Sequence, residues 1–147
     1  MQVGFCTEVG NVRQQNQDSC GYAGGLFVVA DGMGGAQAGE IASAIAVQKL
    51  MSLADVNEGY PGVLADAIGE ANAAVFNMAS ADDNYRGMGT TIALIKVIKG
   101  MVYFAHIGDS RIYLKRDSQL TALTVDHSVA AELLRNGGIT EEEALHH

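Results

Sequence analysis

The sequence predicts an α+β protein in which helices pack on antiparallel β-sheet. Two observations lead to this prediction. Apolar, β-prone runs come first, two helical segments follow, and more β-prone runs come after them, so strands and helices do not alternate as they do around a parallel sheet. The 147 residues are 48% hydrophobic and contain one proline, a composition that supports a sizeable core within one domain.

Short β-prone runs predict the strands. Gly24-Gly25 and Lys99-Gly100 are turn signals between two pairs of these runs, as expected for β-hairpins. In chain order the runs are residues 1–8, Ser19–Tyr22, Leu26–Ala30, Thr90–Ile98, Met101–Ile107, Arg111–Lys115 and Gln119–Leu123.

Apolar spacing and capping signals predict the helices. Five apolar residues within Val63–Ser80 recur in steps of four and three, as on a helix that packs on a core: Leu64, Ile68, Ala71, Val75 and Met78. Pro61 is assigned to the loop that precedes this helix. The other helices are expected over Ala38–Leu53, over His127–Arg135 after a cap at Asp126, and from Thr140, where Thr-Glu-Glu-Glu has capping-box spacing.

Composition narrows the classes of partner and compartment. The formal net charge of −8 argues against nucleic acid as a partner, because phosphate neutralisation needs a basic surface. Cys6 and Cys20 have neither zinc-site spacing nor the density of a disulfide scaffold, so they are expected to be reduced thiols of a cytoplasmic protein. No apolar run approaches the ~18 residues of a membrane span, and the first residues lack the features of a signal peptide.

The stretch LFVVADGMGGAQAGEIAS, Leu26–Ser43, is the centre of the predicted site. Asp31 follows an apolar strand and precedes Gly32, Gly34 and Gly35. A carboxylate beside bare backbone suits a hard cation, because glycine carbonyls can approach the ion as further oxygen ligands. No Gly-Lys-Ser/Thr follows, which excludes a P-loop. Judged from this stretch alone, an ordinary strand–turn–helix connection in which Asp31 caps a turn remains the alternative.

Three aspartates are expected at strand ends or turns: Asp18 in NQDS, Asp31 in ADGMGG and Asp109 in GDSR. Each is a weak signal alone. Together with Arg13 they predict a site for phosphate and metal, because a guanidinium is well suited to hold phosphate oxygens.

An ordered set of motifs resembles the metal-dependent serine/threonine protein phosphatases of type 2C, in their bacterial form. The motifs are Arg13-x-x-Asn16-Gln17-Asp18, VVADGMGG with AGEIAS, GTT at Gly89–Thr91, HIGDSR at His106–Arg111, Asp126-His127-Ser128, and LLRNGGITEEEA. The resemblance covers essentially the whole chain. It implies a sandwich of two antiparallel sheets flanked by helices (α-β-β-α layers).

The resemblance also implies roles for the site residues. The residue matching Asp31 bridges two Mn²⁺ or Mg²⁺ ions, and the backbone carbonyl matching Gly32 binds one of them. Arg13 matches the arginine that holds the substrate phosphate. Asp109 matches the ligand of a third, weaker metal site, and Asp18 would support the metals directly or through water. The implied reaction is hydrolysis of phosphoserine and phosphothreonine on proteins by a metal-activated water, opposing a serine/threonine kinase in signalling.

Three departures from the family pattern qualify this expectation. Gln17 replaces a glutamate of many relatives, and Met33 stands where eukaryotic members have a histidine thought to protonate the leaving group. A further C-terminal part, which supplies two more strand-end aspartates in the family, is missing. The chain is therefore expected to be the N-terminal part (1–147) of a catalytic domain, with about 128–147 as the start of the flap.

Two functions follow as competing expectations. The first is a phosphatase whose fragment is inactive by itself and self-associates through exposed strand edges. The second is a non-catalytic module of the same fold that binds a phosphoprotein or another partner.

Overall fold

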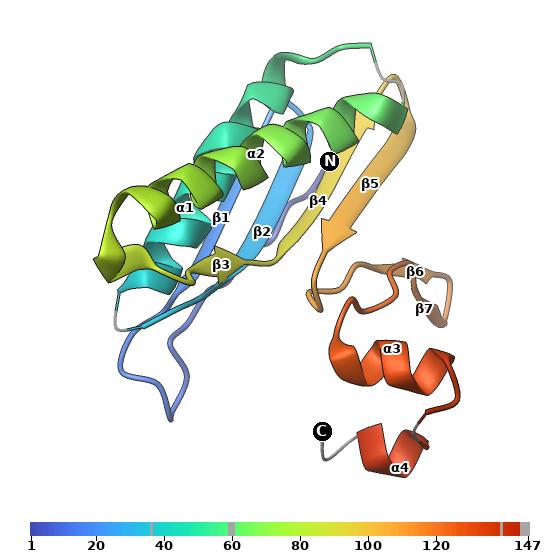
Figure 1. The fold of residues 1–147 in the computed structure, drawn as a ribbon. Coiled ribbons are helices and arrows are strands. Elements are labelled where there is room, and N and C mark those ends of the chain that lie inside the picture. Colours follow the sequence, from blue (N-terminus) through green and yellow to red (C-terminus); the bar gives the residue numbers. More distant parts are fainter. Residues whose placement is uncertain (36, 59–60, 139, 145–147) are drawn as a thin grey trace.

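The computed structural model describes residues 1–35, 37–58, 61–138 and 140–144 (Figure 1). The strands are β1 (Asp18–Ala23), β2 (Leu26–Met33), β3 (Gly89–Thr90), β4 (Ile92–Ile98), β5 (Met101–Ile107), β6 (Tyr113–Arg116) and β7 (Gln119–Ala122). The helices are α1 (Ala38–Leu50), α2 (Pro61–Ala81), α3 (Val129–Arg135) and α4 (Glu141–Ala144), with 3-10 turns η1 (Met51–Asp55) and η2 (Asp83–Tyr85). The strand pairs are antiparallel, which confirms the predicted α+β class.

The main sheet has the strand order β1-β2-β4-β5, and β3 pairs with the end of β2. Both predicted hairpins are present. Their turn residues have positive φ, 54° and 74° at Gly24-Gly25 and 49° and 81° at Lys99-Gly100, which matches the right-handed twist of the flanking strands. Strands β6 and β7 form a separate two-stranded ribbon.

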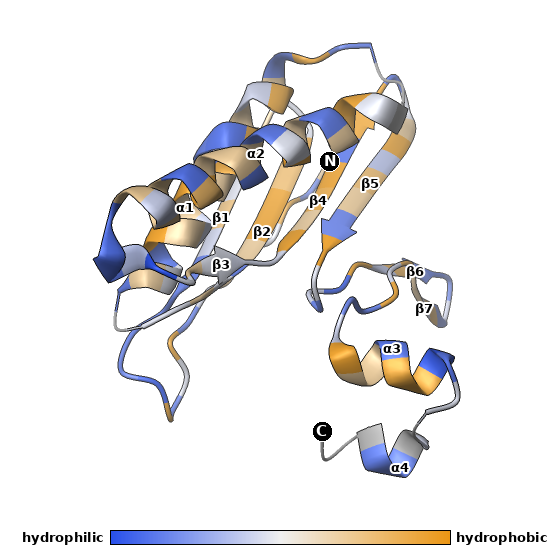
Figure 2. Cartoon of the chain, viewed as in Figure 1, coloured by the Kyte–Doolittle hydropathy of each residue, from blue (hydrophilic) through white to orange (hydrophobic). Residues whose placement is uncertain are grey.

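Helices α1 and α2 cover one face of the main sheet (Figures 1 and 2). Residues Leu26, Val28 and Ala30 of β2 alternate into this core. Small buried side chains on α1, Ala42, Ser43 and Ala46, let the helix approach the sheet closely.

The predicted apolar stripe of α2 is buried from Leu64 to Val75, but Met78 is 41% exposed. Ala79 packs against the core in its place. The stripe therefore continues four residues after Val75 rather than three, within the same helical repeat.

The other face of the main sheet carries exposed apolar side chains. Strand alternation puts Tyr22, Val29, Val102 and Phe104 on this face, and all four are exposed. The described residues thus supply one helix layer and one main sheet of the layered arrangement expected from the family resemblance. An open apolar face of this kind favours association.

Some predicted boundaries are wrong for physical reasons. Residues 1–8 form no strand, because a β-prone run is stable only when it is paired with another strand. Helix α1 ends at Leu50 and tightens into η1, short of the predicted Leu53. Pro61 begins α2 instead of lying in the preceding loop, since the first helical turn does not need its missing N–H. Strand β6 begins at Tyr113, so Arg111 precedes it.

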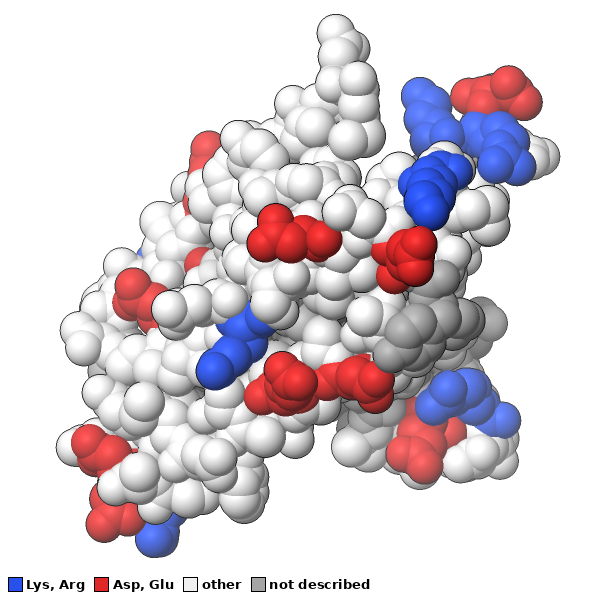
Figure 3. Space-filling model, turned by 90° about the horizontal axis from the view of Figure 1, so that it is seen from above, with Lys and Arg blue, Asp and Glu red and all other residues white. Residues whose placement is uncertain are grey.

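The described ranges hold no helix that is long and apolar enough to cross a membrane. On the face that Figure 3 shows, Lys and Arg side chains are interspersed with Asp and Glu and separated by wide uncharged areas. This face therefore carries no broad field of one sign.

Candidate functional site

Asp31 lies in β2 directly opposite Asp18 in β1. Strand alternation buries its neighbours Ala30 and Gly32 and leaves Asp31 on the open face of the sheet. The prediction that Asp31 sits in a turn after the strand is wrong. Strand β2 continues to Met33, because Gly32 and Met33 pair with Thr90 and Gly89 of β3.

Gly32 is the point at which β2, the segment before β1 and helix α1 meet. Its N–H donates to the Gln17 carbonyl at 3.1 Å. A Cβ at this position would lie 1.9 Å from the Gly39 carbonyl oxygen and 2.6 Å from that of Gln17. Only glycine fits here, and the close approach fixes the backbone next to Asp31.

Two threonines hold the backbone of Asp31 from the other side. The Asp31 N–H donates to the Thr91 hydroxyl at 3.0 Å, and its carbonyl accepts from the Thr91 N–H at 2.9 Å and the Thr90 hydroxyl at 3.0 Å. The Thr91 and Ser110 hydroxyls are 2.6 Å apart, which ties the Asp109 turn to the same network. The GTT motif pointed to these threonines, but sequence reasoning gave them no role.

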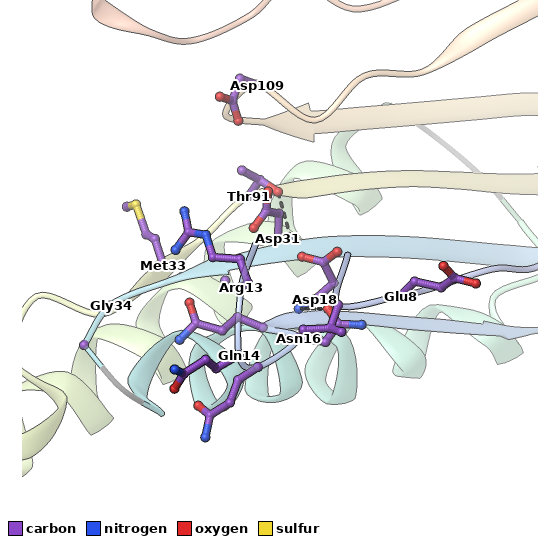
Figure 4. A pocket seen from close by; sticks show the side chains of 15 residues that line it. Glu8, Arg13, Gln14, Asn16, Asp18, Asp31, Met33, Gly34, Thr91 and Asp109 are labelled. Atoms are coloured by element: carbon purple, nitrogen blue, oxygen red, sulfur yellow. Dashed lines mark hydrogen bonds between the residues drawn. The ribbon is translucent and has the colours of Figure 1, made fainter. Parts of the chain in front are cut away.

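Asp31, Thr91 and Asp109 line one cleft of about 790 Å³ (Figure 4). Arg13, Asp18, Asp31, Gly32 and Asp109, all five predicted site residues, contribute to its walls. Glu8, which sequence reasoning did not single out, lines it as well. Its only sequence signal is its place five residues before Arg13.

The pKa of Asp31 is raised above its ordinary value. Burial is the largest cause, and the charge of Asp18, a hydrogen bond with Asp18 and the charge of Asp109 act in the same direction. Arg13 opposes the shift. Arg13 thus offsets only part of the combined effect of burial and the neighbouring carboxylates.

The aspartates share the cleft without forming a ligand cluster. In the parts of the chain that are described, no three His, Cys, Asp or Glu side chains lie close enough together to hold a metal ion. Asp18 and Asp31 are neighbours, whereas Asp109 approaches from the turn after β5 (Figure 4).

The Asp109 turn is fastened to residues 123–127. Arg111 donates to both carboxylate oxygens of Asp126, at 2.8 and 2.6 Å, which lowers the pKa of Asp126. The His127 N–H donates to the Gly108 carbonyl at 2.9 Å, and the His127 ring stacks on His106 with centroids 4.5 Å apart. His106 is thus held by residues 125 and 127, since its Nε2 also lies 2.8 Å from the Val125 carbonyl oxygen.

The predicted helix cap at Asp126 is wrong. Ser128 caps α3 instead, and its hydroxyl accepts from the Ala131 N–H at 3.1 Å. Asp126 instead forms an ion pair with Arg111, a tertiary contact that the local sequence does not reveal. The capping box at Thr140 is confirmed, since Glu143 accepts from the Thr140 N–H and the Thr140 hydroxyl accepts from the Glu143 N–H.

Comparison with known proteins agrees with these motifs. The family model for protein phosphatase 2C matches residues 10–141. The protein phosphatase PhpP of Streptococcus pneumoniae is 38% identical over 161 aligned residues, which include 100% of this chain and 63% of PhpP. The chain thus spans less than two thirds of the length of this curated relative.

Solved structures show the same fold. The serine/threonine phosphatase PstP/Ppp of Mycobacterium tuberculosis superimposes with a TM-score of 0.86 and is 38% identical, over 94% of this chain and 60% of that one. A PstP catalytic domain in complex with two manganese ions gives a TM-score of 0.83 at 39% identity, over 92% of this chain and 60% of that one. Because the family model matches most of the chain, the chain belongs to the protein phosphatase 2C family.

Proposed function

We propose that this chain carries the phosphate-binding residue and part of the metal site of an enzyme that hydrolyses phosphoserine and phosphothreonine on proteins. The main support is the cleft that Arg13 shares with Asp18, Asp31 and Asp109. An exposed guanidinium opposite carboxylates fits a phosphate that is bound together with cations. The substrate would be a phosphorylated cytoplasmic protein, modified by a serine/threonine kinase that the enzyme opposes in signalling.

The proposed cofactors are two or three Mn²⁺ or Mg²⁺ ions in the complete enzyme. Asp31 and the Gly32 carbonyl would hold the central ions, Asp18 would support them, and Asp109 would serve an outer ion. The raised pKa of Asp31 supports this fit, because a cation relieves the repulsion among the carboxylates that contributes to it. When bound, such ions lower the pKa of a water molecule and neutralise charge on phosphoryl oxygens.

The chain's own residues bind and orient the substrate. Arg13 would hold the phosphate oxygens in the cleft, and the network of Thr90, Thr91 and Ser110 would keep Asp31 and the Asp109 turn in register. Met33 has no titratable group, so the leaving group would take its proton from water or from another residue.

We further propose that residues 1–147 are the N-terminal part of one catalytic domain and that about 128–147 begin the flap. Residues 139 and 145–147 of that segment lie outside the described residues. Asp18, Asp31 and Gly32 provide too few anionic ligands to offset the repulsion between two close cations. The chain alone should bind at most one Mn²⁺ weakly and should show no measurable phosphatase activity.

A non-catalytic module that binds a phosphoprotein is the second candidate. The lack of a three-residue ligand cluster among the described residues favours it. Two measurements distinguish the enzyme from the module: calorimetry with Mn²⁺ and a phosphopeptide assay. Both are made on this chain and on any longer product of the same reading frame. Manganese-dependent hydrolysis by the longer product, lost in Asp31→Asn, supports the enzyme, whereas phosphopeptide binding without turnover in both supports the module.

Asp109→Ala tests the proposed division between metal sites. In the longer product it should keep the tight binding of two Mn²⁺ ions but hydrolyse phosphopeptide poorly. Loss of both tight sites in the calorimetric titration would contradict the assignment of Asp109 to an outer ion.

A further inference from the structure

A second cavity of about 620 Å³ lies beside the cleft, between the C-terminal half of α2 and strands β3 to β5. Its floor is apolar and comes from the core, with Ala71 and Val75 of α2, Met88 and Ile92 among the lining residues. We call this cavity the α2 groove. No prediction made from the sequence accounts for it.

Large apolar side chains stand exposed around the α2 groove. Phe76 is 68% exposed, Met33 65% and Ile107 42%, and all three line it. The charged residues in its lining, Asp83 and Arg86, pair with each other at 3.1 Å. An apolar floor, an apolar rim and a matched pair of charges suit an uncharged apolar side chain.

The α2 groove is continuous with the phosphate cleft. Met33 lines both cavities. On the neighbouring chain segment, Thr90 lines the groove and the next residue, Thr91, lines the cleft. The end of β2 and its partner β3 therefore form the boundary between the two cavities, and one ligand can reach across it.

We infer that the α2 groove binds an apolar side chain, aliphatic or aromatic, that lies a few residues from the phosphorylated residue of a protein substrate. This inference rests on the proposed function, since the phosphate must occupy the cleft. Residues of an extended peptide are about 3.3 Å apart, so a peptide that crosses β3 brings one of its next few side chains to the groove. The groove would then select substrates by sequence, independently of the phosphate.

Photo-crosslinking tests this inference at the weak affinity expected of the chain alone. Phosphothreonine peptides carry photo-leucine, a diazirine analogue of leucine, at one position from four residues before to four after the phosphothreonine. Crosslinks are mapped by mass spectrometry. At one or two positions the label should fall on α2 or residues 86–90. Removing the phosphate, or adding excess inorganic phosphate, should lower this labelling about tenfold, because the phosphate in the cleft and the apolar side chain in the groove strengthen each other's binding.

Phe76→Ala should lower groove labelling several-fold. The matched control is Phe5→Ala, which removes a similarly exposed ring that lines neither cavity. Phosphate-dependent labelling that falls outside the groove at all positions would overturn the inference and leave the phosphate site intact. Labelling that never depends on phosphate would instead contradict the proposed function and the inference with it. Groove labelling that declines as the chain concentration rises would mean that a second copy of the chain competes for the groove. That result would also overturn the inference.

Discussion

Replacing Gly32 with alanine should be among the most damaging single changes in this chain. The new Cβ would lie 1.9 Å from the Gly39 carbonyl oxygen, although such contacts essentially never fall below 3.0 Å. Helix α1 and strand β2 must therefore separate by about 1 Å, and the atoms in the way are backbone, which cannot rotate aside. The cost is at the upper end for overpacking, about 3 kcal/mol, and the weakened bond from Gly32 N–H to Gln17 adds about 1 kcal/mol.

Urea denaturation followed by circular dichroism measures this cost. Gly69→Ala is the matched control, because Gly69 lies in α2 and a Cβ added there would meet nothing within 4 Å. At that position the same added methyl group should stabilise the chain by about 0.5–1 kcal/mol, through the higher helix propensity of alanine. A Gly32→Ala variant within about 1 kcal/mol of the parent would refute the steric reasoning.

Three further changes follow from the site and the open sheet face. The pKa of Asp31 is raised in the folded chain without metal, so the free energy of unfolding that this group contributes is present below pH 3.8 and is lost as pH rises through the folded-state pKa. The Asp31→Asn variant should therefore be more stable than the parent at pH 7, as measured by urea denaturation. Arg13→Ala should change unfolding by less than about 1 kcal/mol yet weaken inorganic phosphate binding, measured by calorimetry. The purified chain should be oligomeric by light scattering, and Val102→Lys on the exposed face of edge strand β5 should shift it toward monomer.

The hairpins and the helix stripe were predictable because their signals are local. Gly24-Gly25 and Lys99-Gly100 determine their turns by backbone conformation alone. The grouping of Arg13, Asp18, Asp31 and Asp109 followed from their residue types and their expected positions at strand ends and turns, before the family resemblance assigned them roles, and all four line one cleft.

The wrong predictions concern residues whose conformation depends on a partner far away in the sequence. Asp31 lies within a strand because residues 89–90 pair with the end of β2, more than fifty positions along the chain. Asp126 resembles a helix cap by sequence, yet Arg111 binds it and Ser128 takes that role. Glu8 lines the cleft because residues 1–9, which form no helix or strand, lead past it. The course of such a segment cannot be predicted from hydrophobic periodicity.

The β1–β2 hairpin determines the spacing of two site carboxylates by its length. Asp18 and Asp31 stand opposite each other because each is six residues from the Gly24-Gly25 turn. A single residue inserted into either arm would turn one carboxylate to the helix-covered face, where an unpaired charge is costly. Insertions and deletions in this hairpin are therefore tolerated only as matched changes of two residues in each arm, which keep both the pairing and the face of each carboxylate. The exposed residues of the hairpin, such as Tyr22 and Val29, can therefore vary in identity far more freely than the arms can vary in length.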